Sequence, residues 1–334
     1  MQAVVYQGFG SPDILHLREI DKPVPGDGEV LIKVRAASVN PLDWKLMKGG
    51  PLLARLLIGS GKPKIKCPGV DVAGEVEALG KNITGLKPGD EVFGTCVGAF
   101  AEYATSKSAP GMKSALARKP PIVTFEQAAA VPVAGLTALQ CLRDIGKIQP
   151  GQSVLINGAS GGVGTFAVQL AKSFGANVTG VCSTANADLV RSLGADRVMD
   201  YTQQDFTNAE ERYHLIFDRV GNRPLSAMRR ALHPRGTLVW IGLPPSASLS
   251  RFPARVIGAL LFSPFTRTRT AFFIAKVNQK DLTTLGELLS TGELKPVIAK
   301  RFPLSEAPDA FRYLETGHGR GKVILTPESQ SLTN

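Results

Sequence analysis

Cysteine and histidine are scarce in this 334-residue chain, which limits the metal and disulfide chemistry open to it. The four cysteines lie far apart, so no two have the close spacing of a zinc clip or a redox Cys-x-x-Cys motif. The histidines are isolated in the same way: His16, His214, His233 and His318. We therefore expect reduced thiols, typical of a cytoplasmic protein, and no metal site.

Long apolar runs and targeting signals are also missing. No uninterrupted stretch reaches the ~18 apolar residues that a membrane-spanning helix requires. Residues 1–6 contain no basic stretch ahead of an apolar core, so no secretory signal is predicted and a cytoplasmic location is expected.

The net charge is +11, but Lys and Arg are spread along the chain without an arginine-rich arm or a DNA-reading motif. This pattern predicts no nucleic-acid partner; a phosphate-rich cofactor or an anionic membrane surface explains the charge better. Segments 52–66 and 251–269 are apolar and then basic. They can form a lipophilic entrance or touch a membrane peripherally, but the interpretation we favour is a covered loop and a subunit interface.

The predicted secondary structure changes near Pro121. Before it, short β-prone runs separated by Gly/Pro turns predict a compact, barrel-like domain: 3–6, 29–37, 74–78 and 91–93. After it, predicted strands (153–157, 177–182, 197–200, 215–218, 237–241) alternate with predicted helices (125–141, 165–174, 187–193). This alternation predicts a parallel, doubly wound sheet. Two helix–strand pairs within 282–325 can either extend that sheet or return to the first domain.

A glycine-rich turn, 157–164, links the first strand of the predicted sheet to a helix. Its Ala-x-Gly-x-x-Gly spacing is a version of the dinucleotide fingerprint, and it lies in the strand–turn–helix context that the motif requires. Small residues let the backbone approach a pyrophosphate, and the helix N-terminus offers amide donors. The predicted cofactor contacts here are Ala159, Ser160, Gly161, Gly162, Val163 and Gly164.

The end of the next predicted strand indicates which dinucleotide binds. NAD enzymes usually carry Asp or Glu there, ~20 residues past the motif, to bind the ribose 2′-hydroxyl. This chain instead has Ser183 and Thr184. An acid repels a 2′-phosphate, whereas hydroxyls can donate to it, so NADPH is predicted over NADH.

Several ordered segments carry a family resemblance: 38–45, 68–74, 87–92, 100–103, 131–138, 157–164 and 317–322. They resemble the zinc-free quinone oxidoreductase (zeta-crystallin-like) group of the medium-chain dehydrogenase/reductase family. Segment 317–322 is especially similar to the subgroup of the chloroplast-envelope quinone oxidoreductase homologue and the reticulon-interacting mitochondrial oxidoreductase. The resemblance implies an α/β fold, with a GroES-like β-barrel domain (1–122 and 274–334) and a Rossmann NADPH-binding domain with a doubly wound parallel sheet (123–273). It also implies an active site in the cleft and a homodimer.

The resemblance further implies that no metal takes part. Zinc-dependent relatives use a Cys within the segment matching 38–43 and a His after Gly69, whereas this chain has no Cys there and Val70. An aliphatic side chain cannot replace imidazole as a ligand. Without a metal to polarise a hydroxyl, the expected substrates are small lipophilic compounds that are already electrophilic, namely quinones and α,β-unsaturated carbonyl compounds.

Similarity to the family places Asn40 and Asp43 near the nicotinamide and the substrate. Asn40 can donate a hydrogen bond to a carbonyl oxygen as it becomes an enolate or quinol oxygen. Lys45 is either a cationic stabiliser or proton donor, or a solvated surface lysine. Arg320 is a candidate partner for a cofactor phosphate. The same similarity gives the remaining predicted cofactor contacts: Thr137, Tyr201, Leu243, Phe273, His318 and Gly319.

The sequence therefore predicts an NADPH-dependent, metal-free reductase that transfers hydride to quinones or α,β-unsaturated carbonyl compounds. Two alternatives stay open. One is a reductase specific for enoyl or alkenal double bonds. The other belongs to a different class: a non-catalytic NADPH-binding protein of the crystallin-like kind.

Overall fold

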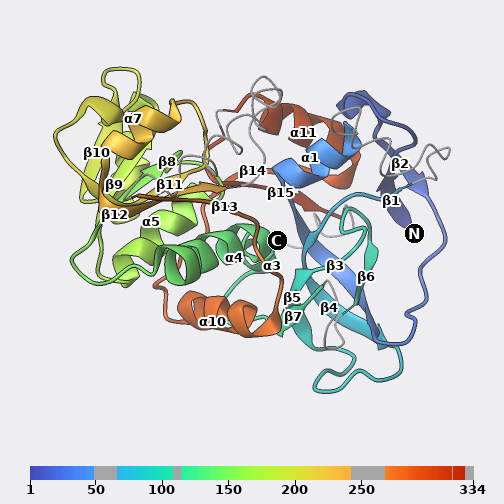
Figure 1. Cartoon of the computed structure of the whole chain (residues 1–334). Helices are drawn as coiled ribbons and strands as arrows, with labels where there is room; N and C mark the ends of the chain where they lie inside the picture. Colours follow the sequence, from blue (N-terminus) through green and yellow to red (C-terminus); the bar gives the residue numbers. More distant parts are fainter. Residues whose placement is uncertain (49–65, 108–113, 242–267, 318, 328–334) are drawn as a thin grey trace. The chain divides into compact units, whose positions relative to one another are not determined.

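The computed structural model describes residues 1–48, 66–107, 114–241, 268–317 and 319–327, without the side chains of residues 45 and 46. The chain divides into two compact units (Figure 1). One unit comprises Met1–Val133 and Val277–Asn334, and the other comprises Ala134–Lys276. Most of segments 52–66 and 251–269 lies outside the described residues, so their predicted roles stay predictions.

The first unit is built on a largely antiparallel sheet that uses both ends of the chain. Its strand order is β14 (Ile298–Pro303), β15 (Lys322–Thr326), β3 (Glu29–Val39), β4 (Asp71–Leu79), β5 (Glu91–Thr95) and β7 (Leu116–Arg118). Three further strands complete the unit: β6 (Tyr103–Lys107) pairs with β3, and β1 (Gln2–Val5) pairs with β2 (His16–Glu19). Strand β15 runs antiparallel to β3, with Val323 opposite Val39. The end of the chain therefore returns to the first unit.

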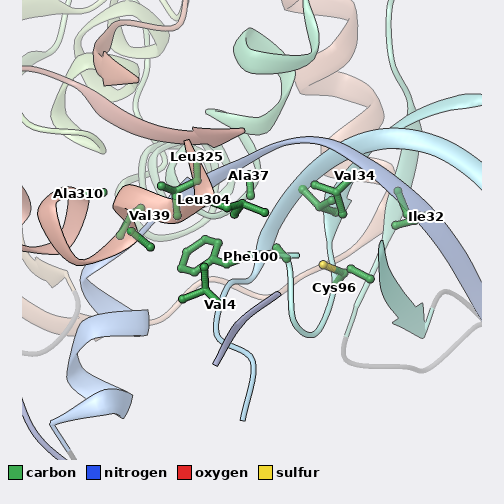
Figure 2. Close-up of a cluster of buried hydrophobic side chains, with 14 of the residues drawn as sticks. Val4, Ile32, Val34, Ala37, Val39, Cys96, Phe100, Leu304, Ala310 and Leu325 are labelled. Atoms are coloured by element: carbon green, nitrogen blue, oxygen red, sulfur yellow. The ribbon is translucent and has the colours of Figure 1, made fainter. Parts of the chain in front are cut away.

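Alternating apolar residues place one face of β3 in the core of this unit. Val30, Ile32 and Val34 are all at most 2% exposed, because successive side chains on a strand point to opposite faces. Figure 2 shows this cluster, in which Phe100 and Leu304 lie among residues from distant parts of the sequence. Phe100 also meets Phe311 of α11 (Ala307–Glu315) edge to face, with ring centroids 6.0 Å apart.

The predicted helix 125–141 is two helices in the structure. α3 (Phe125–Ala129) begins with a capping box, in which Thr124 and Gln127 each bond the other's backbone N–H. α4 (Pro132–Gln140) begins at a proline, which has no N–H to continue the preceding helix. A π-helical turn, Cys141–Gly146, follows α4.

The second unit is a wholly parallel sheet. Its strand order is β10 (Arg197–Asp200), β9 (Asn177–Cys182), β8 (Ser153–Asn157), β11 (Tyr213–Asp218), β12 (Leu232–Ile241) and β13 (Arg269–Phe273). The described helices between these strands are α5 (Gly164–Ser173), α6 (Ala187–Ser192) and α7 (Leu225–Arg230). The chain proceeds outward from β8 in one direction and then resumes at β11 on its other side. This reversal makes the carboxyl ends of β8 and β11 a topological switch point, where doubly wound sheets bind ligands.

The predicted α/β fold class is thus confirmed, and β8 and β9 have the predicted bounds. The sequence did not predict β13. One further helix, α10 (Gln279–Ser290), belongs to the first unit, as does the short α1 (Pro41–Met47). No helix in the described part of the chain is long and apolar enough to cross a membrane.

Phe311→Ala tests how far the C-terminal return stabilises the first unit. The side chain is fully buried, so truncation should lower the free energy of unfolding by ~3–5 kcal/mol through lost burial and a cavity. The urea midpoint of the first unit's transition is the measurement. Ile122→Ala, at a side chain 78% exposed in the same unit, should shift stability by less than ~0.5 kcal/mol. Equal shifts of the urea midpoint in the two variants would contradict a stabilising role for Phe311 in the core of the first unit.

Candidate functional site

The glycine-rich turn connects β8 to α5 and is held against β9. The backbone N–H groups of Gly158 and Ala159 donate to the carbonyl of Val181 at 3.2 and 3.0 Å. Gly158 has a φ of +90°, a conformation that favours glycine. A Cβ on Gly164 would lie 2.1 Å from the Gly158 carbonyl oxygen, so only glycine lets α5 start this close to the turn.

This turn has the features of a pyrophosphate cradle. A Cβ added to Gly161 would meet only the Gly158 oxygen, at 3.4 Å, so this glycine keeps an open approach to the backbone. No side chain caps the N-terminus of the ten-residue α5. The Thr165 N–H already donates to the Gly161 carbonyl at 2.9 Å, so the positive end of the helix dipole is what favours an anion here. The residues present fit the dinucleotide that the motif predicts.

The two hydroxyls predicted to favour NADPH have different partners. The Ser183 hydroxyl oxygen accepts a hydrogen bond from the side-chain amide of Asn186 at 3.3 Å. The Thr184 hydroxyl donates to the carboxylate of Asp200, at the end of the adjacent β10. Hydrogen bonds from Thr184 and from the backbone of Thr202 hold the pKa of Asp200 below its usual range. Of the two hydroxyls, Ser183 is the better placed to donate to a 2′-phosphate.

The other cofactor candidates of the second unit lie on several elements. Tyr201 follows β10, is 44% exposed, and donates its backbone N–H to Cys182 at 3.1 Å, which holds it beside the end of β9. Phe273 ends β13 and Thr137 lies in α4, and both are buried. Leu243 lies outside the described residues.

The candidates of the first unit occur at α1 and just before β15. Gly319 and the exposed Arg320 form the approach to β15, while His318 lies outside the described residues. Asn40 and Asp43 are both buried, at the start of α1. Lys45 lies in α1, but its side chain is outside the described part.

A buried lysine that sequence reasoning missed organises the surroundings of Asn40. The Lys322 ammonium, on a side chain only 4% exposed, donates to Asn40 Oδ1 at 2.6 Å and pairs with Asp71 at 3.3 Å. Asp71 also accepts from Ser38 and from Asn40 Nδ2, each at 2.9 Å, and from the Val133 N–H at 3.0 Å. Removing one partner from such a buried pair typically costs ~3–5 kcal/mol. The sequence signal that could have revealed this pair is one charged residue within each of two otherwise apolar runs: Asp71 in 68–74 and Lys322 in 321–325.

This network fixes the orientation of the Asn40 amide. Its oxygen accepts from Lys322, and its nitrogen donates to Asp71 at 2.9 Å and to the Ser38 carbonyl at a longer 3.4 Å. To donate to a substrate oxygen, as the sequence predicts, Asn40 has to exchange one of these bonds. The long bond to Ser38 is the weaker one.

Asp43 is a buried acid whose carboxyl group has a raised pKa. Burial above all, together with the nearby Asp71, raises the pKa of Asp43 from 3.8 to about 7, although hydrogen bonding from the Asn40 N–H opposes the rise. That N–H donates to the Asp43 carboxyl at 2.8 Å and ties it to the first turn of α1.

No group of three or more His, Cys, Asp or Glu side chains within the described ranges is arranged to hold a metal ion. The four cysteines are free, and burial raises the pKa of the Cys67 thiol to about 12. The metal-free interpretation remains a prediction from the missing ligands.

Asp43→Asn should flatten the dependence of stability on pH. With a pKa raised to about 7, folded Asp43 keeps its proton between pH 4 and 7 while the unfolded chain releases it. The parent's free energy of unfolding should therefore fall as pH rises through this window and level off above it. The Asn variant lacks this proton and should lose less stability.

The measurement is a series of urea unfolding curves from pH 4.5 to 8. Asp27→Asn, at an exposed aspartate of the same unit, is the matched control and should follow the parent. Parallel curves for the parent and the Asp43 variant would contradict a protonated Asp43 in the folded state.

Comparison with known proteins gives matches over most of the chain. The family description "Alcohol dehydrogenase GroES-like domain" matches residues 26–140, and "Zinc-binding dehydrogenase" matches residues 193–325. A chloroplastic quinone-oxidoreductase of Triphysaria versicolor is 34% identical over 98% of this chain and 98% of its own length. A chloroplastic NADPH-dependent alkenal/one oxidoreductase of Arabidopsis thaliana is 33% identical, covering 98% of this chain and 80% of that protein.

A solved structure shows the same similarity in three dimensions. The quinone oxidoreductase of Coxiella burnetii superposes with a TM-score of 0.84 at 32% identity, over 98% of this chain and 99% of its own. The similarity therefore extends over both units.

Proposed function

Because this chain belongs to the medium-chain dehydrogenase/reductase family, we propose that it is an NADPH-dependent, metal-free reductase of quinones or α,β-unsaturated carbonyl compounds. The observation that carries the proposal is the glycine-rich turn, open at Gly161 and uncapped at α5, with the hydroxyl of Ser183 beside it. The names of the relatives, which include quinone and alkenal/one oxidoreductases, support the substrate class.

NADPH supplies the hydride in such chemistry, and the protein binds it and stabilises the charge that develops on the substrate. In this proposal the backbone of the turn from Ala159 to Gly164 holds the pyrophosphate, and the Ser183 hydroxyl recognises the 2′-phosphate. The further contacts proposed for the cofactor are Thr137, Thr184, Tyr201, Leu243, Phe273, His318, Gly319 and Arg320.

Asn40 is the proposed hydrogen-bond donor to the substrate oxygen. The Lys322 ammonium on its carbonyl oxygen withdraws electron density and strengthens the N–H donor, since hydrogen bonds in a chain polarise one another. Asp43 holds the backbone of Asn40 and is a positioning residue in this scheme. Lys45 remains a candidate proton donor.

A second activity, reduction of a carbon–carbon double bond, is favoured by one specific observation. The relatives include a 2-methylene-furan-3-one reductase of Solanum lycopersicum as well as the alkenal/one oxidoreductase. Product analysis separates the two, because one activity yields a quinol or semiquinone and the other a saturated carbonyl compound.

We also propose a homodimer and a cytoplasmic location with peripheral membrane contact as an option. In the described part of the second sheet β13 is an edge strand, which a second copy can extend. Two of the relatives named here are chloroplastic, so the cellular location of this chain needs its own measurement.

The central test is a comparison of NADPH and NADH oxidation across quinones, alkenals and enones. We expect turnover with several of these acceptors and a kcat/KM at least about tenfold higher with NADPH, which corresponds to ~1.4 kcal/mol of discrimination. Equal efficiency with both nucleotides would overturn the 2′-phosphate argument. Tight NADPH binding without turnover on the whole panel would favour the non-catalytic alternative.

Ser183→Asp should weaken NADPH binding at least about tenfold, because a carboxylate repels the 2′-phosphate and removes a donor. NADH binding should change much less. The measurement is the Kd for each nucleotide from the quenching of protein fluorescence. Ser192→Asp introduces the same charge at an exposed serine on α6 and serves as the control. Unchanged NADPH affinity in the Ser183 variant would exclude Ser183 as the discriminator.

A further inference from the structure

Asn186 lies in the short helical turn Thr184–Asn186 that follows β9, and only 8% of the residue is exposed. Its amide nitrogen donates to the hydroxyl oxygen of Ser160 at 3.1 Å and to that of Ser183 at 3.3 Å. One serine belongs to the glycine-rich turn and the other follows β9. The buried Asn186 amide thus donates one hydrogen bond to each of the two hydroxyls.

These two bonds determine what the serine hydroxyls can offer a ligand. A hydroxyl has one O–H donor and two acceptor lone pairs, and its hydrogen rotates to suit its surroundings. When Asn186 donates to the oxygen, the hydroxyl hydrogen cannot point back along that bond. Both serines are therefore left as donors toward a neighbouring anion, and donors to an ionised oxygen form the stronger class of hydrogen bond.

The orientation of the Asn186 amide is decided by comparing the cost of burying its oxygen without a partner with the cost of burying its nitrogen in the same place. Asn186 Oδ1 is buried and has no hydrogen-bond partner within the described residues. Reversing the amide would let Oδ1 accept from both serines, but it would leave two N–H donors buried in its place. A buried group without a partner costs ~1–3 kcal/mol, so one orphaned acceptor is the smaller loss.

We propose that Asn186 sets the preference for NADPH, by orienting the Ser160 and Ser183 hydroxyls as a pair of donors for the 2′-phosphate. The inference rests on the proposed function, since it assigns a specificity-determining residue to the same cofactor site. Thr184 does not belong to this pair, because its hydroxyl donates to Asp200. Asn186 acts through the serines and is a positioning residue.

Asn186→Asp is the sharpest test, since it keeps the shape and replaces the amide donors by carboxylate acceptors. The serine hydrogens should then turn toward the carboxylate, and its charge opposes the phosphate. We expect the Kd for NADPH to rise at least about tenfold while the Kd for NADH changes less than about threefold. Asn177→Asp makes the same substitution at the opposite end of β9, where it should leave the ratio of the two Kd values unchanged.

A second set of variants separates orientation from charge and serves if the aspartate variant does not fold. Asn186→Ala and Ser183→Ala are each expected to reduce the NADPH preference several-fold, and their effects should not add in the double variant. Additive effects, or equal losses for both nucleotides, would show a merely structural role for Asn186 and overturn the inference.

The parent protein distinguishes this inference from the proposed function. If the parent binds NADPH no better than NADH, the proposed cofactor preference itself fails. If the parent prefers NADPH and Asn186→Asp keeps that preference, only the role of Asn186 fails.

Discussion

The ammonium of Lys322 is the interaction on which the polar interior of the first unit depends. It is a buried cation that joins Asn40 to Asp71, and without it a carboxylate and an amide would be buried against each other with no compensating charge. The pairing of β15 with β3 places it there, because Val323 lies opposite Val39 and the preceding residue therefore reaches Asn40. Strand β15, near the end of the chain, thus contributes the cation of a polar cluster whose other members, Asn40 and Asp71, come from its first part.

Much of the fold could be predicted because local pattern and tertiary structure agree. β8 and β9 are short apolar runs bounded by turns, and their ends match the sequence prediction. The prediction failed where one residue overrode the pattern, as at Pro132, which divides an alanine-rich helical stretch into α3 and α4. It was also undecided about β15, because periodicity specifies a strand but not the partner with which it pairs.

The site was predictable to the extent that its residues are close in sequence. The glycine-rich turn has its own spacing and context, so it was found directly. Ser183 and Thr184 are adjacent, yet only the structure shows that one faces Asn186 and the other Asp200. Lys322 and Asn40 are far apart in the chain, and Asn186 resembles an ordinary turn residue. No sequence spacing indicates such contacts.

The buried lysine also bears on the predicted absence of a metal from this protein. The family resemblance matches Val70 and segment 38–43 to the ligand positions of zinc-dependent members, so introducing Cys and His there is the obvious route to a zinc site. The Lys322 ammonium lies 2.6 Å from Asn40 Oδ1, however, and a divalent ion at that position would meet a fixed charge of the same sign. Ligand replacement alone would therefore give a poor metal site. A change from metal-free to zinc-dependent chemistry, whether by design or by evolution, would also require an uncharged residue in place of Lys322.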